Sequence, residues 1–255
     1  MRAQSKKPVQ VKNTVIGGPL PLICLPIVAK DRDDLLTQAR ELMPLKPDLI
    51  EWRIDGYEKA RDVKDCIKAL KDLLPLIDPV PLIFTCRTEC EGGLQPLSDQ
   101  DRLDLILGTM KTGLLDIVDT ELCNGQDYID SVIKEAKASH TRVILSCHDF
   151  KKTPSRDFIL DKLTEARDRG ADIAKLAAMP NEYEDVLSLM EATLTARNTR
   201  IDIPIITMSM GEKGVVSRVA GGVFGSDVTF AIGKKASAPG QIPIQDLRQA
   251  MSVLY

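Results

Sequence analysis

Short apolar runs rich in β-branched residues alternate along the whole chain with longer stretches in which apolar side chains recur at helical spacing. That alternation is typical of βα units, in which a helix returns the chain and the next strand lies parallel to the last. The pattern therefore predicts a parallel sheet with helices packed against it. The apolar runs are residues 22–28, 48–54, 81–87, 114–122, 142–148, 172–179, 203–210 and 227–233.

Eight βα units in 255 residues match the size of one (β/α)8 barrel, and we predict that residues 1–255 form a single domain of this fold. An open doubly wound sheet is the alternative, but no glycine-rich turn follows the first run. Ahead of that run, residues 9–16 alternate between apolar and polar positions. We expect them to form a small β-hairpin that closes the bottom of the barrel.

The helix expected after residues 81–87 shows how the helical segments are delimited. Ser98 followed by Asp101 is a capping-box pair that marks its start. Apolar residues at helical spacing then predict the face that packs on the sheet. That predicted face consists of Leu103, Ile106, Leu107 and Met110.

Composition and charge narrow the class of protein. The chain has 34 basic and 37 acidic residues, a formal charge of −3 that gives no general attraction to nucleic acid or anionic membrane. No apolar run approaches the ~20 residues that span a bilayer, and no apolar block follows the basic residues of the N-terminus. We therefore expect a soluble cytoplasmic protein with neither a nucleic-acid nor a membrane partner.

The six cysteines predict neither disulfides nor a metal site. Cys24, Cys86, Cys123 and Cys147 lie in or at the ends of apolar runs, where a free thiol behaves as a small apolar side chain. Cys86 and Cys90 have no second Cys or His pair nearby that would complete a zinc site. A reducing compartment fits this usage best.

Charged and polar side chains interrupt the apolar runs at their C-terminal halves. In a closed parallel barrel these strand ends all open onto one face, the face that carries catalysis. Charges at such depth have to be paired with one another or bound by a ligand. The interrupting residues are Glu51, Arg53, Arg87, Asp119, Glu121, His148 and Lys175.

Lys175 lies in a wholly apolar setting, residues 174–179, with no carboxylate nearby in its own run. Desolvation disfavours an ammonium ion, so we expect this amine to lose its proton more readily than an exposed lysine does. A neutral amine attacks carbonyl groups and forms an iminium ion. The alternative is a structural lysine that reaches the barrel mouth beside Glu121.

His148 is one of two histidines, and His140 falls in an expected surface loop. Because only imidazole titrates near neutrality without perturbation, His148 is a candidate proton shuttle. The alternative is a histidine satisfied within the core.

Two loops and one arginine complete the candidates from the residues alone. Residues 88–94 and 234–241 contain the glycine and proline residues that suit a lid, although ordinary surface loops have a similar composition. Arg218, near the start of the seventh helix, is suited to bind an anionic group of a ligand, or else is a plain surface arginine.

Motifs on seven of the eight units, in order over residues 15–255, resemble type I 3-dehydroquinate dehydratases. The resemblance implies a hydro-lyase that converts 3-dehydroquinate to 3-dehydroshikimate and water in the shikimate pathway, without metal or cofactor and as a homodimer. The motifs are EWRID (51–55), FTCR (84–87) with EGG (91–93), SCHDF (146–150), KKTP (151–154), ADIAKLAAMP (171–180), PIITMSM (204–210), SRVAG (217–221), VFGS (223–226) and SAPGQ (237–241).

The resemblance also implies a role for each matching residue. Lys175 corresponds to the lysine that forms the Schiff base, His148 to the general acid and base, and Glu91 to the acid that orients the histidine. Substrate binding falls on Arg218 for the carboxylate, on Ser237 and Gln241 in the last loop, and on Glu51, Arg53 and Arg87 for the hydroxyl groups. Met208, Met210 and Phe230 correspond to apolar walls.

Two other classes of function use the same residues. A class I aldolase also places a lysine on the sixth strand of a barrel, but Arg218 and residues 237–241 suit a carboxylate and hydroxyls better than a phosphate. A metabolite sensor without activity would not need Lys175, His148 and Glu91 together. We therefore expect a dehydratase.

Overall fold

The structure, a computed structural model, describes residues 2–234 and 238–255. Within these ranges eight parallel strands form a barrel, in the order β10-β3-β4-β5-β6-β7-β8-β9. The backbone N–H of Asp227 donates to the carbonyl of Ile205 at 2.7 Å and joins the two end strands at their starts. The strands are β3 (Leu22–Ile27), β4 (Leu49–Arg53), β5 (Leu82–Thr85), β6 (Ile117–Glu121), β7 (Arg142–Asp149), β8 (Ile173–Ala178), β9 (Ile205–Ser209) and β10 (Val228–Phe230).

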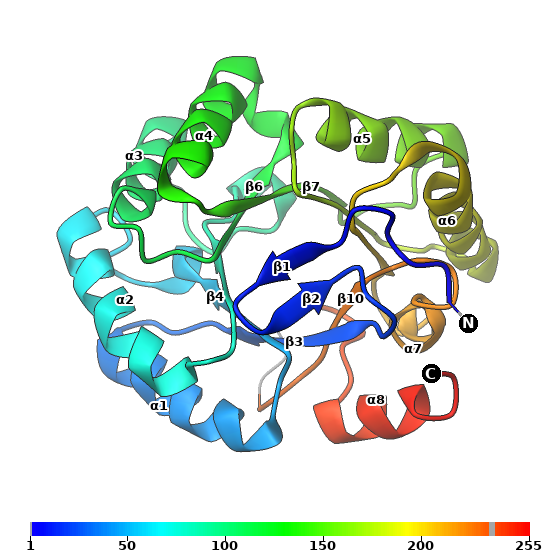
Figure 1. The fold of residues 1–255 in the computed structure, drawn as a ribbon, viewed down its shortest axis with the longest axis horizontal. Coiled ribbons are helices and arrows are strands. Elements are labelled where there is room, and N and C mark those ends of the chain that lie inside the picture. The colour runs from blue at the N-terminus through cyan, green and yellow to red at the C-terminus, as the bar shows by residue number, and fades with distance from the viewer. Residues whose placement is uncertain (1, 235–237) are drawn as a thin grey trace.

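The helices surround the barrel, as the view along its axis shows (Figure 1), which confirms the predicted (β/α)8 fold. The α-helices are α1 (Arg32–Leu42), α2 (Val63–Ile77), α3 (Asp99–Met110), α4 (Gln126–Ser139), α5 (Arg156–Asp168), α6 (Tyr183–Thr195), α7 (Val215–Ala220) and α8 (Ile244–Met251). Single turns follow several elements: η1 (Met43–Leu45), η2 (Ile54–Gly56), η3 (Glu89–Glu91), η4 (Leu122–Asn124) and η5 (Ala196–Arg200).

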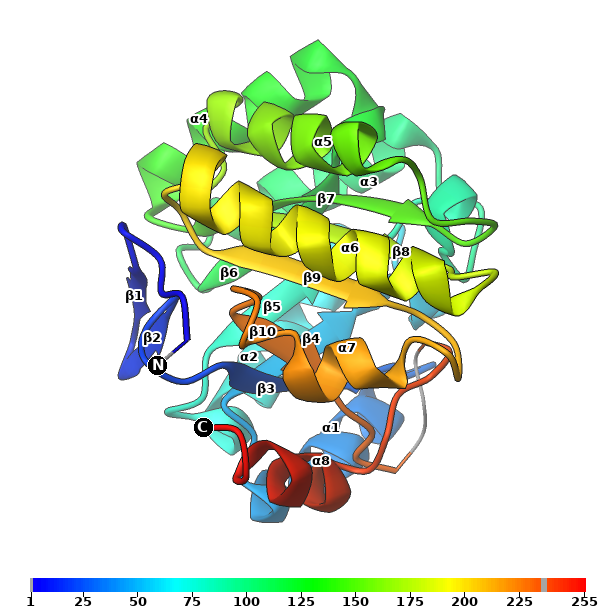
Figure 2. The ribbon, with the colours of Figure 1, turned by 90° about the vertical axis from the view of Figure 1, so that its right-hand side faces the viewer.

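The predicted hairpin is present and lies across the N-terminal ends of the barrel strands (Figure 2). Its strands, β1 (Val9–Val11) and β2 (Thr14–Ile16), are antiparallel. Their buried apolar side chains pack against interior residues at the starts of the barrel strands, such as Ile83 and Ile173. The hairpin therefore excludes water from one end and leaves the opposite end for ligands.

The two-residue period of a strand divides each barrel strand between two cores. Outward-facing residues such as Leu25, Trp52 and Leu145 pack under the helices. Inward-facing residues are apolar at the strand starts, where Ile117 and Ile144 meet the hairpin. Two or four positions later the inward residues of β4 to β8 become polar, whereas those of β9 and β10 stay apolar, so a largely polar layer lies above an apolar floor.

The predicted buried face of α3 was partly wrong. Ser98 does cap the helix, accepting a hydrogen bond from the Asp101 backbone N–H at 3.1 Å, and Ile106 and Met110 are buried. Leu103 and Leu107, however, are only partly buried. The helix is rotated so that the buried face consists of Arg102, Leu105, Ile106, Thr109 and Met110.

The cysteines in the described ranges are all free thiols. Cys24 and Cys86 are buried and Cys147 is partly buried, as expected of structural thiols. The prediction was wrong for Cys123, which follows β6 in η4 and is exposed. Within the same ranges no three His, Cys, Asp or Glu residues are grouped as a metal site.

None of the helices in residues 2–234 and 238–255 has the length and apolar character that a bilayer span requires.

A buried ion triad ties the segment before the hairpin to the barrel. Asp227, whose side chain is fully buried, pairs with Arg2 and with Arg197 of η5. Its Oδ2 also accepts the backbone N–H of Ile205 at 2.8 Å. One carboxylate therefore holds the N-terminal segment, the helical layer and the junction of β9 with β10.

We expect Asp227→Ala to lower the free energy of unfolding by ~3–5 kcal/mol, because it leaves two buried guanidinium groups without their shared counter-ion. Urea unfolding followed by circular dichroism measures this. Asp161→Ala is the matched control, since the Asp161 carboxylate pairs with Arg200 at the surface and is 74% exposed. It should cost at most ~1 kcal/mol, and equal losses in the two variants would contradict the argument.

Candidate active site

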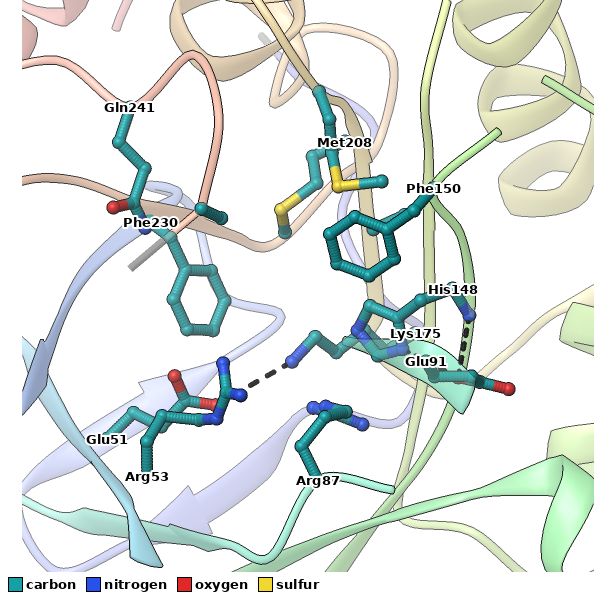
Figure 3. A pocket seen from close by; sticks show the side chains of 13 residues that line it. Glu51, Arg53, Arg87, Glu91, His148, Phe150, Lys175, Met208, Phe230 and Gln241 are labelled. Atoms are coloured by element: carbon teal, nitrogen blue, oxygen red, sulfur yellow. Dashed lines mark hydrogen bonds and ion pairs between the residues drawn. The ribbon is translucent and has the colours of Figure 1, made fainter. Parts of the chain in front are cut away.

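A pocket opens where the barrel strands end (Figure 3). Most of the predicted site residues line it together, although they come from separate βα units. The lining residues are Glu51, Arg53, Arg87, Glu91, His148, Phe150, Lys175, Ala177, Met208, Met210, Phe230, Ala238 and Gln241.

Strand geometry accounts for this convergence. Residues two apart face the same side of a strand, so Glu51 and Arg53 both face the interior from β4. Lys175 occupies the equivalent inward position two residues after Ile173 on β8. His148 does so near the end of β7, two residues after the buried Ser146.

Lys175 is an ion-paired lysine at the base of the pocket, only 5% exposed. Its Nζ donates to Asp119 Oδ2 at 2.6 Å and lies 3.9 Å from Glu51 Oε1. The amine also lies 4.7 Å from the centroid of the Phe230 ring. As predicted, its own strand offers no carboxylate, but the alternative placement beside Glu121 was wrong, because the partner is Asp119 of β6.

Barrel shear explains that correction. The hydrogen-bonded register aligns Lys175 with Ser146 of β7 and Ser146 with Glu121 of β6. Strands in such a barrel are tilted, with a stagger of about one residue per strand. Two strands away, the residue that meets Lys175 is accordingly Asp119, two positions before Glu121.

Asp119 is fully buried and has three partners. Besides the lysine, Arg87 Nη2 donates to it at 3.0 Å and Ser146 Oγ at 2.6 Å. Burial alone would raise the pKa of Asp119, but Arg87 and Lys175 lower it well below its usual value. Asp119 is therefore an anion that holds the lysine amine in place.

His148 and Glu91 form a second pair at the rim of the pocket. Both the backbone N–H and the ring Nδ1 of His148 lie 2.8 Å from Glu91 Oε2. Burial lowers the pKa of His148 well below its usual value, and the nearby Arg87 and Lys175 lower it further. Burial and Glu121 raise the pKa of Glu91 to about 7, although Arg87 opposes them. The histidine is therefore neutral near pH 7, and its Nε2 is free of the contact with Glu91.

The hydroxyl-binding candidates are held by other polar side chains. Arg53 forms two hydrogen bonds with Asp55, at 2.8 and 2.7 Å, and a third with the carbonyl of Gly92 at 3.1 Å. Glu51 accepts a hydrogen bond from Thr85 Oγ1 at 2.9 Å. These contacts fix the side chains before any ligand enters.

Arg218 of α7 differs from the other buried arginines named above. Its guanidinium donates to the carbonyls of Phe230 (3.2 Å) and Pro239 (2.8 Å), and in the described ranges no carboxylate lies within ion-pair distance of it. Burial lowers the pKa of Arg218 to about 10. A buried cation surrounded by neutral acceptors is a site for an anionic ligand group.

Comparison with known proteins assigns the chain to a family. Residues 23–255 match the model of type I 3-dehydroquinase. The chain belongs to the type I 3-dehydroquinase family. Curated 3-dehydroquinate dehydratases of Bacillus licheniformis and Clostridioides difficile are 42% and 41% identical to it, each over 250 residues that cover 98% of both chains.

Solved structures agree with this assignment. The 3-dehydroquinate dehydratase of Geobacillus kaustophilus superposes with a TM-score of 0.96 at 40% identity, over all of this chain and 98% of that one. The type I enzyme of Clostridium difficile, solved with covalently modified comenic acid, superposes with a TM-score of 0.94 at 41% identity, over 97% of each chain.

The site of this type I 3-dehydroquinase also contains residues to which the sequence analysis gave no role. Asp119 was expected at the barrel mouth but not as the partner of the lysine, and Ser146 and Thr85 were overlooked. Each lies two residues before a predicted polar position on its strand, so the two-residue period could have identified them. Phe150 lies two residues after His148, just past the end of β7, and its ring stacks beside the His148 ring with the centroids 6.4 Å apart.

Three predicted site residues remain. Gln241 lines the pocket, as do the expected apolar walls, which include Met208. Arg218 is not among the lining residues, but it touches Phe230 and Met208, which are. Ser237 lies outside the described residues.

Proposed function

We propose that this protein dehydrates 3-dehydroquinate to 3-dehydroshikimate through a Schiff base on Lys175, as a step of the shikimate pathway. The observation that carries the proposal is the placement of a buried lysine amine and a histidine held by Glu91 in one pocket, in a member of the type I 3-dehydroquinase family. A relative solved with covalently modified comenic acid supports covalent chemistry in the family.

The chemistry begins when His148 takes a proton from the ammonium group of Lys175 and the freed amine attacks the ketone carbon of the substrate. The ketone oxygen takes up that proton from His148 and a second one from the attacking nitrogen and leaves as water, which leaves an iminium ion. The positive iminium acidifies the neighbouring C–H bond, because it accepts the electron pair that the carbon retains. No metal or cofactor is required for that activation.

His148 then removes the acidified proton through Nε2, while Glu91 holds its Nδ1. The resulting enamine expels the β-hydroxyl group, which takes the proton from His148 and leaves as water. Hydrolysis of the product iminium consumes one water and releases 3-dehydroshikimate and the free lysine. The balance is the loss of one water from the substrate.

Substrate recognition follows from the charges around the pocket. Arg218 binds the carboxylate, and Gln241 and Ser237 are the further residues assigned to substrate binding. Glu51, Arg53 and Arg87 bind hydroxyl groups. The apolar side chains of Met208, Met210 and Phe230 keep water away from the iminium until product has formed.

Two measurements test the proposed function. Purified protein mixed with 3-dehydroquinate should produce the ultraviolet absorbance of a conjugated enone, at a rate that a chelator does not change. Borohydride added during turnover should leave a reduced adduct on Lys175 that mass spectrometry locates. Turnover without an adduct would refute the Schiff base, and absence of turnover would refute the dehydratase. Carbon–carbon cleavage would favour an aldolase instead.

We expect Arg218→Met to raise KM by about 10²-fold while kcat falls much less, because the carboxylate loses a charge-assisted partner in ground and transition states alike. Steady-state kinetics at one pH separates the two constants. Arg218→Lys, which keeps the charge but not the planar donors, should raise KM by a smaller factor. An unchanged KM in the Met variant would place the carboxylate elsewhere.

A homodimer, which the resemblance implies, stays a prediction that sedimentation of the purified protein can test.

A further inference from the structure

Arg102 is a buried arginine on the outer face of the barrel wall. It lies on α3, yet its side chain is only 1% exposed. Nη1 donates to Glu121 Oε2 at 3.2 Å, Nη2 donates to Asp99 at 2.7 Å, and the guanidinium lies 5.5 Å from the Tyr128 ring centroid. Burial of a charge at this depth is costly, and an apolar side chain could fill the same space without that cost.

A continuous series of ion pairs leads from Arg102 to the pocket. The second oxygen of Glu121, Oε1, accepts from Arg87 Nη1 at 2.6 Å. Arg87 Nη2 donates to Asp119 at 3.0 Å, and Asp119 accepts from Lys175 at 2.6 Å. Arg102 thus lies at the outer end of the network that holds the lysine.

The same network determines the charge around the acid–base pair. Glu91 faces Glu121, Arg87 and the thiol of Cys123. The charged groups that face His148 are Glu91, Arg87, Lys175, Asp119 and Arg53. Among the described residues of this network, the buried cations Arg53, Arg87, Arg102 and Lys175 pair with the buried anions Glu51, Asp55, Asp119 and Glu121, and Arg102 also contacts the exposed Asp99.

We propose that Arg102 is a positioning residue that neutralises one oxygen of Glu121. Arg87 then keeps its hydrogen bond to Asp119, and the negative charge of Glu121 is compensated before it can act on the pair formed by Glu91 and His148. The inference rests on the function proposed above, because it concerns the protonation of the groups assigned to proton transfer. Arg102 itself does not line the pocket.

The direction of the effect follows from electrostatics. Without the charge of Arg102, one oxygen of Glu121 keeps only the neutral amide of Asn124 as a partner, at 3.1 Å, and its negative charge acts on Glu91, which contacts the His148 ring. A nearby negative charge favours the protonated forms of a carboxyl group and of an imidazole alike. Both groups should then take up a proton at higher pH. The acid limb of the plot of kcat/KM against pH, where the activity falls with decreasing pH, should therefore shift to higher pH.

Arg102→Met, which keeps the length of the side chain and removes its charge, is the main variant. We expect its acid limb to move up by about half to one pH unit, whereas Arg102→Lys should keep the wild-type limb. Glu121→Gln should move the limb down, and the double variant should return it toward the wild-type position. Arg61→Met is the matched control, because Arg61 also pairs with α3, at Asp101, but is 62% exposed.

A second readout does not depend on turnover. The chain has two histidines, so a variant of the exposed His140 assigns the ring resonances of His148 by NMR. In Arg102→Met the His148 resonance should titrate at higher pH than in the wild type.

The outcomes separate the two proposals. In Arg102→Met, the acid limb and the titration of the His148 resonance could both stay unchanged while only the midpoint of unfolding falls. This result would overturn the proposed role and show that Arg102 is only structural. If that variant does not fold, Glu121→Gln decides, since an unchanged limb there overturns the same role. A wild-type protein that does not dehydrate 3-dehydroquinate refutes the proposed function, and the resonance then still tests the electrostatic effect.

Discussion

Turnover of 3-dehydroquinate is expected to fall by about 10⁴-fold or more when Lys175 is replaced by alanine, while the substrate still binds. Without the amine no iminium forms, and the C–H bond beside a plain ketone is far less acidic. Substrate recognition falls on Arg218 and the hydroxyl-binding residues, which the change leaves in place. Steady-state rates and isothermal titration calorimetry measure the two quantities separately.

Lys175→Arg is the control for the ion pair with Asp119. A guanidinium group can keep the charge beside Asp119 and Glu51, but it remains protonated and does not attack a carbonyl. If Lys175 were only a structural lysine, this variant would retain much of its activity. Equal loss of rate and of binding in Lys175→Ala would likewise contradict the Schiff base.

The close contact of Lys175 with Asp119 bears on how the amine becomes reactive. The Asp119 carboxylate accepts a hydrogen bond from Nζ at 2.6 Å, whereas attack on a carbonyl requires the lone pair of an unprotonated amine. The amine has to give up a proton during the reaction, and in our proposal His148 accepts it. The two residues therefore act as one unit.

Much of the fold could be predicted because strand and helix periods are local properties of the sequence. The spacing of the apolar runs predicts parallel strands, and the polar residues at their C-terminal halves predict the catalytic face. The hairpin at residues 9–16 could be predicted in the same way, since apolar and polar side chains alternate along it. These features depend only on residues close in the chain.

The contacts across the barrel could not be predicted in the same way. Whether Lys175 meets Asp119 or Glu121 depends on strand tilt and stagger, which are properties of the closed barrel and not of β6 or β8 alone. The pairing of Arg53 with Asp55 was missed for another reason. The turn η2 at the end of β4 brings the Asp55 carboxylate back to Arg53, and the two-residue period of a strand does not describe such a turn.

The orientation of α3 shows a third limit. Apolar spacing placed Leu103 and Leu107 inward, but the ion pair of Arg102 with Glu121 and the buried Leu105 define a face rotated from that one. A charged residue occupies a core position only where a partner of opposite charge is present. Here the partner lies on another element, so the sequence of the helix does not reveal it. Sequence periodicity contains no information about such a pair.

Replacing His148 with alanine is expected to lower kcat by about 10³-fold while the iminium still forms. The reason lies in the division of roles: Lys175 supplies the electron sink, whereas His148 supplies the base that removes the proton. Borohydride trapping should therefore recover an adduct on Lys175 under conditions in which product formation is nearly absent. Normal turnover, or the absence of any adduct, would remove His148 from the role proposed here.

Glu91→Gln separates the base from the group that orients it. In the wild type the pKa of Glu91 is about 7, so this carboxylate takes up a proton near neutral pH. Below that pH the Nδ1–H of His148 no longer has an anionic acceptor. Activity should accordingly decline as the pH falls through about 7. An amide at position 91 cannot ionise, so the variant should show a lower maximal rate and an acid limb moved to lower pH. A limb that stays in place would show that another group sets it, and His148 would then act without help from Glu91.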